Sequence, residues 1–328
     1  MASEGTVPVT LLAGFLGAGK TTLLNRIVSS EELGRVAVVV NEFGELGIDG
    51  SLVVGADEDV VELRNGCVCC TVRGDLSRTL NRLLARRRAL LGRLRFDRIV
   101  IELSGMASPG PVVQTMVVDD GLRDALHLDG IVTLANAREV GRQISAHPEA
   151  AAQVGYADLL VLNHTDGVDE RGLEAARAAL RSINGVADIR TSVRGELPIE
   201  RLSGLASGDA RTWSLATTHV CDDACDHAAH EHSTDVATAA FETEEQIDLH
   251  KLKVWLQFVS SRRDAELIRL KGIVSCAGQS RAVVVQSVYQ WLEIGPADFE
   301  PPDRSRMVVI GRGLDLPALE RGWRTLVA

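Results

Sequence analysis

A glycine-rich segment near the start of the chain constrains the possible fold more than any other feature. Residues 14–21 read GFLGAGKT and match the pattern G-x-x-x-x-G-K-[ST] at every fixed position. An apolar run precedes the segment and a helix-like run follows it, as the motif requires. Backbone N–H groups of such a loop surround phosphate oxygens, and the helix N-terminus adds the positive end of its dipole. A glycine-rich turn without a ligand is the alternative, but the complete motif in this context favours a phosphate-binding loop.

The rest of the first 205 residues predicts the sheet that such a loop needs. Short apolar runs alternate with helical segments, a pattern typical of a parallel sheet wrapped by helices. Several runs are continuously apolar, as expected for strands buried on both faces. We expect strands at residues 7–13, 36–41, 98–103, 130–134, 159–163 and 188–191, and helices at 21–30, 76–91, 149–156 and 170–183.

The remaining sequence predicts a linker and a second, smaller domain. Residues 207–240 are polar and contain two cysteines and four of the eight histidines. Beyond them we expect helices at residues 249–259 and 316–325, with strands near 267–276, 282–288 and 307–310. The predicted fold class is therefore α/β, a P-loop parallel sheet flanked by helices, followed by a smaller α+β C-terminal domain. The first domain is predicted to span residues 1–206, the linker residues 207–240 and the C-terminal domain residues 241–328.

Composition excludes several functional classes. A net charge of −10 and a pI near 5.4 argue against nucleic-acid binding, which needs a basic face. No apolar run approaches the ~18 residues that a membrane span needs, and the first residues do not resemble a signal peptide. Six cysteines without a secretory signal indicate reduced thiols, which favour metal binding over disulfides. We therefore expect a cytoplasmic protein.

Two further segments extend the predicted nucleotide site. Glu102 ends an apolar strand-like run and Gly105 follows three residues later, where P-loop enzymes place a carboxylate near Mg²⁺ and a glycine N–H near the γ-phosphate. Residues 163–166 read NHTD and resemble the guanine-reading N-K-x-D sequence. Asp166 would accept from guanine N1–H and from its exocyclic amine, donors that adenine lacks. The alternative for Glu102 is a polar strand end without a ligand, and the alternative for residues 163–166 is a polar turn.

Three cysteines within four residues form the second chemical motif. Cys67, Cys69 and Cys70 supply soft thiolate donors suited to Zn²⁺, Cu(I) or Co²⁺. Buried apolar thiols or a redox pair are the alternatives, but polar neighbours favour a metal site. Residues 41–50, which include Glu42, lie where a nucleotide-sensing switch is expected. Their carboxylates are candidates to contact Mg²⁺, a catalytic water or the transferred metal. For Glu45, the default interpretation is an exposed loop side chain with no such role.

Taken together, these motifs resemble the CobW-type GTPases, relatives of the hydrogenase and urease nickel-insertion GTPases. Similarity extends to residues 110–115, the histidine-rich linker and the C-terminal runs 269–272 and 307–311. The resemblance implies a GTPase that holds Zn²⁺ or Co²⁺ at the C-x-C-C motif and delivers it to a client metalloprotein or metal-insertion machinery. The oligomeric state is left open, with a metal- or nucleotide-dependent dimer as one option.

The resemblance also implies roles for individual residues. Departures from the family pattern are His164 in place of lysine, Leu103 where Thr or Ser is common, and Asn136 where Asp is common. The implied residues are Lys20, Glu102 and Glu42 for catalysis; Gly14, Gly17, Ala18, Gly19, Lys20, Thr21, Thr22, Gly105, Asn163 and Asp166 for the nucleotide; Thr21 for Mg²⁺; and Cys67, Cys69 and Cys70 for the transferred metal.

Two other functions are compatible with the same motifs. One is a metal-responsive regulatory protein that uses nucleotide only for structure. The other is an enzyme such as a metallocofactor kinase or a subunit of a chelatase, which would turn over a small acceptor.

Overall fold

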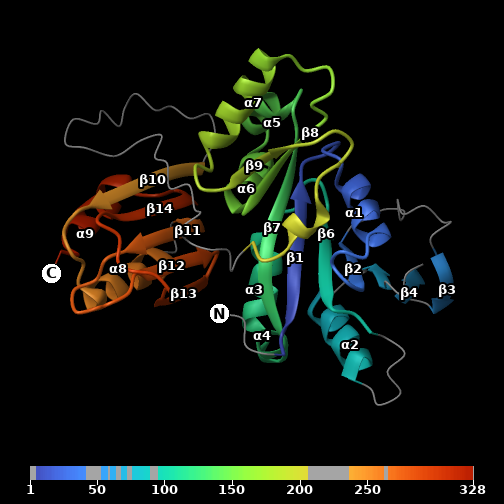
Figure 1. The fold of residues 1–328 in the computed structure, drawn as a ribbon, viewed down its shortest axis with the longest axis horizontal. Helices are drawn as coiled ribbons and strands as arrows, with labels where there is room; N and C mark the ends of the chain where they lie inside the picture. Colours follow the sequence, from blue (N-terminus) through green and yellow to red (C-terminus); the bar gives the residue numbers. More distant parts are fainter. Residues whose placement is uncertain are drawn as a thin grey trace. The chain divides into compact units, whose positions relative to one another are not determined.

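The structure is a computed structural model that describes residues 5–41, 53–57, 60–63, 68–71, 76–88, 95–205, 236–261 and 265–327 (Figure 1). Its elements are β1 (Val7–Gly14), α1 (Lys20–Ser29), β2 (Val36–Asn41), β3 (Val53–Asp57), β4 (Val60–Leu63), β5 (Val68–Thr71), α2 (Leu76–Arg88), β6 (Arg98–Leu103), α3 (Gly110–Val118), α4 (Asp120–Ala125), β7 (Leu126–Asn136), α5 (Val140–Ala146), α6 (Pro148–Tyr156), β8 (Leu159–Asn163), α7 (Glu170–Arg181), β9 (Asp188–Thr191), a 3-10 helix (Ile199–Leu202), β10 (Val236–Thr243), α8 (Leu249–Ser261), β11 (Glu266–Val274), β12 (Val283–Val288), β13 (Trp291–Pro296), β14 (Ser305–Arg312) and α9 (Leu316–Arg324).

The chain forms two compact units, and each unit is assembled from three separate stretches of the sequence. The first contains residues 1–140, 157–177 and 189–208, and the second contains residues 141–156, 178–188 and 209–328. Strand β10 begins at Val236 and pairs along its length with β14, so the second sheet starts before residue 241. The division into domains at 1–206 and 241–328, joined by a linker at 207–240, remains a prediction.

The first unit is built on a nine-stranded sheet in the order β3-β4-β5-β2-β6-β1-β7-β8-β9. Strands β5, β2, β6, β1, β7 and β8 are parallel, whereas β3 and β4 add an antiparallel edge. Strand β1 lies between β6 and β7 in the middle of the sheet (Figure 1). The carboxyl ends of the parallel strands therefore meet at one edge, which is where ligands bind in sheets of this kind.

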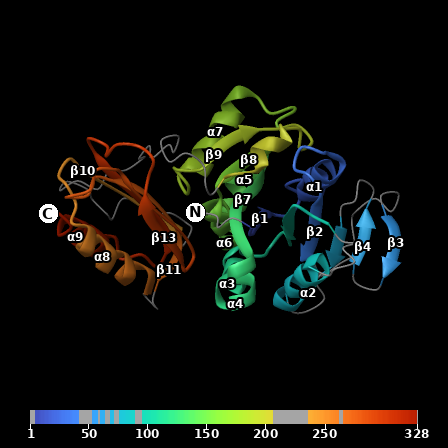
Figure 2. The same ribbon diagram turned by 60° about the horizontal axis from the view of Figure 1, so that its bottom comes forward.

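Apolar side chains cover both faces of this sheet. One face packs against α1 and the 3-10 helix through residues such as Leu23, Leu24 and Ile199, all buried. Helices α2, α3 and α4 contact one another and lie below the sheet in the turned view, opposite α1 (Figure 2). The predicted parallel sheet flanked by helices is confirmed.

Asp119 ties α2 to α4 beside this sheet. Its carboxylate caps α4 by accepting from the Leu122 N–H (3.1 Å), and it also accepts from the Ser77 hydroxyl and from Asn81 Nδ2 (2.9 Å) of α2. The hydrogen bond from Ser77, followed by that from Leu122, lowers the pKa of the Asp119 carboxyl below 3.8. The ionised carboxylate is thus the form that the folded state stabilises.

This arrangement predicts a pH-dependent contribution of Asp119 to stability. Because the folded-state pKa is depressed, the contribution is complete above the unfolded-state pKa and disappears as pH falls through the folded-state pKa. Asp119→Ala is expected to lower the free energy of unfolding near neutral pH, with a difference from wild type that shrinks as pH falls from the unfolded-state pKa through the folded-state pKa. Urea unfolding measures it. Asp120→Ala, which removes an exposed partner of Arg123, is the control, and a pH-independent Asp119 effect would contradict the assignment.

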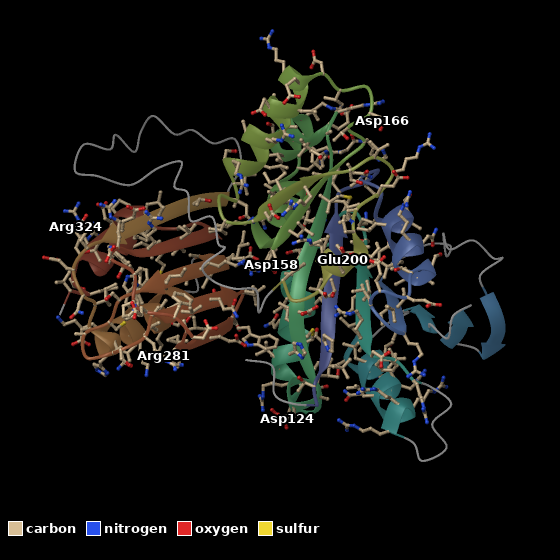
Figure 3. All side chains as sticks on the ribbon, viewed as in Figure 1. Asp124, Asp158, Asp166, Glu200, Arg281 and Arg324 are labelled. Carbon is tan, nitrogen blue, oxygen red and sulfur yellow. The ribbon has the colours of Figure 1, made fainter. Side chains whose placement is uncertain are left out.

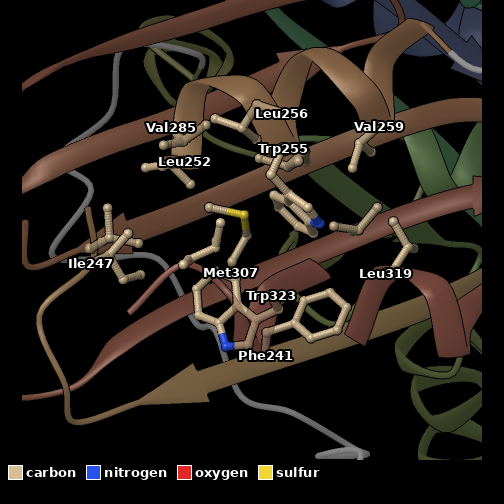
Figure 4. Close-up of a cluster of buried hydrophobic side chains, with 14 of the residues drawn as sticks. Phe241, Ile247, Leu252, Trp255, Leu256, Val259, Val285, Met307, Leu319 and Trp323 are labelled. Atoms are coloured by element: carbon tan, nitrogen blue, oxygen red, sulfur yellow. The ribbon is translucent and has the colours of Figure 1, made fainter. Parts of the chain in front are cut away.

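The second unit contains an antiparallel sheet in the order β10-β14-β11-β12-β13. Helices α8 and α9 pack on one face, where Phe241, Trp255 and Trp323 form a cluster of three rings (Figure 4). Phe241 stacks on Trp323 with centroids 5.6 Å apart, and Trp255 meets both rings edge-on. Such aromatic pairs stabilise a core by about 0.5–1.5 kcal/mol each beyond the burial of their area.

Helix α6 also belongs to the second unit. Its last residue, Tyr156, donates through its hydroxyl to Glu266 (2.9 Å), and its carbonyl accepts from the guanidinium of Arg269 (3.2 Å). Arg269 lies on β11 and is only 1% exposed. Because a buried guanidinium needs acceptors, the α6 carbonyl helps to make this charged side chain acceptable inside the unit. Contacts separated by more than a hundred residues thus join α6 to the C-terminal sheet.

The predicted elements agree with the structure within a few residues wherever the chain is described. The predicted strand 130–134 is longer, since β7 spans Leu126–Asn136. The sequence did not predict strands β10 and β13 or helices α3, α4 and α5. It also did not predict β3, β4 and β5, which add to the edge of the first sheet. The backbone of Cys69 and Cys70 lies in β5, a strand that the polar neighbours of these thiols did not suggest. Strands of four or five residues with polar members have too little alternation to be recognised from sequence.

The ring cluster gives a sharp test of packing in the second unit. A Cβ added at Gly322 of α9 would lie 2.4 Å from Trp255 Nε1 and 2.5 Å from Trp255 Cδ1. Gly322→Ala is expected to destabilise the protein by about 1–3 kcal/mol through overpacking, although alanine favours helices. Gly141→Ala in α5, where no described atom lies within 4 Å, should instead stabilise by up to about 1 kcal/mol. Denaturant unfolding measures both; a stabilising Gly322→Ala would contradict the packing.

Candidate nucleotide site

The phosphate-binding loop joins β1 to α1 and needs its glycines. Gly14, Gly17 and Gly19 have φ values of 143°, 73° and 98°, which side chains with a Cβ rarely adopt. A Cβ at Gly14 would lie 2.5 Å from the Leu134 carbonyl oxygen, and one at Gly19 would lie 2.3 Å from Asn163 Nδ2. The loop is therefore packed closely against the ends of β7 and β8.

Lys20 lies under this loop at the first position of α1. Its side chain donates from Nζ to the Gly14 carbonyl (2.9 Å) and the Phe15 carbonyl (3.4 Å), and the residue is 9% exposed. A buried ammonium group requires acceptors, and phosphate oxygens entering the loop would be stronger acceptors than carbonyls. Lys20 therefore lies at the phosphate loop, and its contact with phosphate stays a prediction.

Thr21 and Glu102 meet although they are far apart in the sequence. The Thr21 hydroxyl donates to Glu102 Oε1 at 3.1 Å, and Glu102, at the end of β6, is 4% exposed. A hydroxyl oxygen and a carboxylate are hard oxygen donors of the kind that Mg²⁺ prefers, so the pair fits the ion predicted for it. Gly105 follows, and a Cβ there would lie 2.5 Å from Leu16 Cδ2, which brings this loop against the phosphate loop. Thr22 is exposed in the first turn of α1.

Asn163 joins three segments of the site. Its Nδ2 donates to the Ala18 carbonyl of the phosphate loop (2.9 Å), and its Oδ1 accepts from the Gly195 N–H (3.0 Å). The residue is 0% exposed. The amide thus fixes the phosphate loop to the end of β8 and to the segment after β9. Direct contact between Asn163 and a base stays a prediction.

His164 and Asp166 lie in the loop that follows β8. Asp166 has a half-exposed side chain and is labelled at this loop in Figure 3. His164 has a φ of 59°, a left-handed conformation uncommon outside glycine, and its ring lies close to Gly19. The imidazole therefore lies beside the phosphate loop, whereas the carboxylate of Asp166 remains open to solvent for a base.

The segment 192–195 is a part of the site that the sequence analysis missed. The Ser192 carbonyl accepts from the Thr165 hydroxyl (3.0 Å), and the Arg194 carbonyl accepts from Arg26 of α1 (3.0 Å). One signal was present in the sequence, because this segment directly follows the last strand predicted for the first 205 residues. Segments at the carboxyl ends of strands in such a sheet line the ligand site.

Comparison with known proteins identifies the family. Residues 8–191 match the family described as CobW/HypB/UreG, nucleotide-binding domain, and residues 236–327 match the cobalamin synthesis protein cobW C-terminal domain. The chain belongs to the CobW/HypB/UreG family. The family predicted by resemblance is thereby confirmed over both halves of the chain.

Two relatives are similar to this chain over more than nine tenths of their length. The chain is 30% identical to the zinc chaperone YjiA of Escherichia coli, with 96% of each chain covered. It is 32% identical to the zinc chaperone CobW of Pseudomonas aeruginosa, covering 100% of this chain and 93% of that one. A crystal structure of Zn(II)-bound YjiA GTPase from E. coli has a TM-score of 0.78 at 29% identity and covers 98% of this chain and 99% of that chain. These names agree with the prediction of a GTPase.

Several predicted family site residues lie outside the described part of the structure. Cys67, Glu42 and the histidine- and cysteine-containing stretch 219–232 are among them, so their roles stay predictions. Among the described residues, no three His, Cys, Asp or Glu side chains form a group that could hold a metal ion. No described helix has the length and apolar character needed to cross a membrane.

The contacts of Asn163 and Asp166 predict different mutant phenotypes. Asn163→Ala would leave the Ala18 carbonyl and the Gly195 N–H without this partner, and should cost about 2–4 kcal/mol of stability together with nucleotide affinity. Asp166→Ala, at an exposed position, should change stability by less than about 0.5 kcal/mol while still weakening guanine nucleotide binding. Thermal unfolding and nucleotide titration separate the two effects. Equal loss of stability in both variants would contradict these assignments.

Proposed function

We propose that this chain is a cytoplasmic, GTP-hydrolysing metallochaperone that holds Zn²⁺ at Cys67, Cys69 and Cys70 and releases it to a client protein. The observation that supports this most is the position of β5, which carries Cys69 and Cys70, within the sheet that carries the nucleotide site. Strand β5 pairs in parallel with β2, and β2 pairs in parallel with β6, which ends near Glu102.

The register gives the scale of this proximity. Thr71, directly after Cys70, is in register with Val40, and Val40 is in register with Glu102. Two strand spacings of about 4.8 Å place the backbones of Thr71 and Glu102 about 10 Å apart. Only β2 lies between β6, which carries Glu102, and β5, which carries Cys69 and Cys70. A displacement of the end of β6 on γ-phosphate binding would therefore reach the thiols through a single strand.

The chemistry of nucleotide hydrolysis follows from the residues of the site. Lys20 binds the β- and γ-phosphate oxygens, and backbone N–H groups of the phosphate loop neutralise their charge. Mg²⁺ bound near Thr21 and Glu102 supplies charge stabilisation of the phosphates. Asp166 accepts hydrogen bonds from guanine, and Glu42 is the candidate that orients the attacking water. No arginine finger is assigned among the described residues, so intrinsic hydrolysis is expected to be slow.

The proposed coupling is a two-state switch. GTP orders the switch segment 41–49, whose first residue is the last of β2, and this draws the thiolates into a tight metal site. Hydrolysis relaxes that segment and lowers the affinity for the metal. Linkage then requires that bound metal tighten GTP binding by the same factor.

The relatives support zinc as the metal. YjiA and the Pseudomonas CobW protein are named zinc chaperones, and a fission-yeast relative, 32% identical over 94% of this chain, is named zinc-regulated GTPase metalloprotein activator 1. Zn²⁺ also suits thiolate ligands, as does Co²⁺. A YjiA variant with a glutamate and two cysteines replaced by alanine is also described as Zn(II)-bound. A test must therefore measure the nucleotide-dependent affinity and not merely the presence of zinc.

Zinc titration in three nucleotide states tests this function. The purified protein is titrated with Zn²⁺, Co²⁺ and Ni²⁺ in the presence of a non-hydrolysable GTP analogue, GDP or no nucleotide. Zn²⁺ is expected to bind at least about tenfold more tightly with the analogue than with GDP, which corresponds to about 1.4 kcal/mol of coupling. The triple substitution of Cys67, Cys69 and Cys70 by serine should abolish this difference.

Cys276 provides the matched control for thiol removal. It is a buried thiol in the second unit, and burial raises its pKa to about 11, so it stays protonated and is a poor metal ligand. Cys276→Ala should keep the nucleotide-dependent difference. Equal zinc affinity in the analogue and GDP states of the wild type would contradict the switch and would favour a purely structural nucleotide.

A further inference from the structure

Arg138 contacts the base-reading loop from the neighbouring strand. It lies just after β7, and its Nη2 donates to the backbone carbonyl of Asp166. The same nitrogen lies 4.0 Å from Asp166 Oδ2, so one guanidinium contacts both the backbone and the carboxylate of a single residue. It also lies against Gly167, where an added Cβ would be 3.1 Å from Arg138 Nη2.

The turn that carries Arg138 is itself fixed to the site. Asn136, the last residue of β7, is in register with Asn163 of β8, and the Ala137 N–H donates to the Asn163 carbonyl (2.8 Å). The Asn136 side chain then accepts from the Arg138 N–H (3.1 Å), which closes an Asx-type turn. Asn136 is a position at which this chain departs from the family pattern, and it sets the direction in which Arg138 leaves the strand.

We propose that Arg138 is a positioning residue for guanine recognition, which holds the Asp166 loop so that its carboxylate faces the base edge. This inference rests on the proposed GTP-binding function but not on the metal site. Arg138 contacts no phosphate-loop residue in any described interaction, so its effect is confined to the base. The carbonyl hydrogen bond fixes the loop backbone, and the guanidinium lies 4.0 Å from the carboxylate that it would orient.

The need for such a residue follows from the exposure of Asp166. A half-exposed carboxylate on a loop loses rotational freedom when it binds a base, and that loss weakens binding. His164, which replaces the usual lysine, lies close to Gly19 on the phosphate-loop side. Arg138 approaches from the β7 side and restricts the loop before the nucleotide arrives.

The guanine base offers a specific readout for this role. Asp166 would accept from both the N1–H and the exocyclic amine of guanine, whereas hypoxanthine presents only the N1–H. The ratio of dissociation constants for inosine diphosphate (IDP) and GDP therefore reports how well the carboxylate is placed. A residue that served only the stability of the fold would not change this ratio.

Binding of GDP and IDP to the full-length protein tests the proposal. Arg138→Ala should raise the dissociation constant for GDP by about three- to tenfold, and that for IDP by less, so the ratio falls toward that of Asp166→Ala. The kcat at saturating GTP should stay unchanged, whereas KM rises. Arg138→Lys, which keeps the charge, should recover part of the ratio, and thermal unfolding verifies that each variant is folded.

Arg123→Ala is the matched control. Arg123 forms an exposed ion pair with Asp120 on α4, so its removal should leave both dissociation constants as in wild type. An unchanged ratio in Arg138→Ala, with or without a uniform loss of affinity, overturns the proposal. A wild type that binds GDP and IDP equally also overturns it, because the carboxylate then does not read the amine. Failure to bind any guanine nucleotide would instead overturn the underlying GTP-binding function.

Discussion

The side-chain amide of Asn163 is the interaction on which the rest of the nucleotide site depends. Three segments meet at the carboxyl edge of the sheet. The end of β8 supplies the amide, the phosphate loop supplies the Ala18 carbonyl, and the segment after β9 supplies the Gly195 N–H. A fully buried amide makes these bonds away from competing water, so the loss of either leaves an unsatisfied group inside the protein. The phosphate loop and the segment at Gly195 are consequently fixed to each other before a ligand binds. Preorganisation of this kind lets a site bind its nucleotide without ordering loops at that moment.

In the proposed function, the parallel sheet is the physical link between the phosphates and the thiols. Thr21 is hydrogen-bonded to Glu102, and Glu102 belongs to β6, which shares its neighbour β2 with β5. Packed strands have few alternative arrangements, so displacement at one strand end is passed to the next strand and not absorbed locally. The proposed coupling between nucleotide and metal depends on this strand order.

The sequence allowed the prediction of parts of the site governed by local spacing. The loop from Gly14 to Thr21 and the carboxylate of Glu102 follow from fixed intervals along one strand–loop–helix unit, and the structure places them together. The partners of Asn163 did not follow, since Ala18 lies 145 residues away and contributes only a backbone carbonyl, which has no sequence signature. Arg138 was missed for a related reason, because its contact is also with a carbonyl. Backbone partners become visible only when the topology is known.

The grouping of α6 with the C-terminal sheet shows the same limitation on a larger scale. Apolar spacing predicts α6 as a helix but contains no information about which sheet it covers. One contact that joins α6 to this sheet involves Arg269, a buried charge on β11 whose guanidinium donates to the carbonyl at the end of α6. A chain cut near residue 207 or 241 would keep β11 and lose that carbonyl, leaving a buried guanidinium without this acceptor. The second unit thus includes a helix that ends 80 residues before β10 begins, so a cut at either position would remove part of this unit.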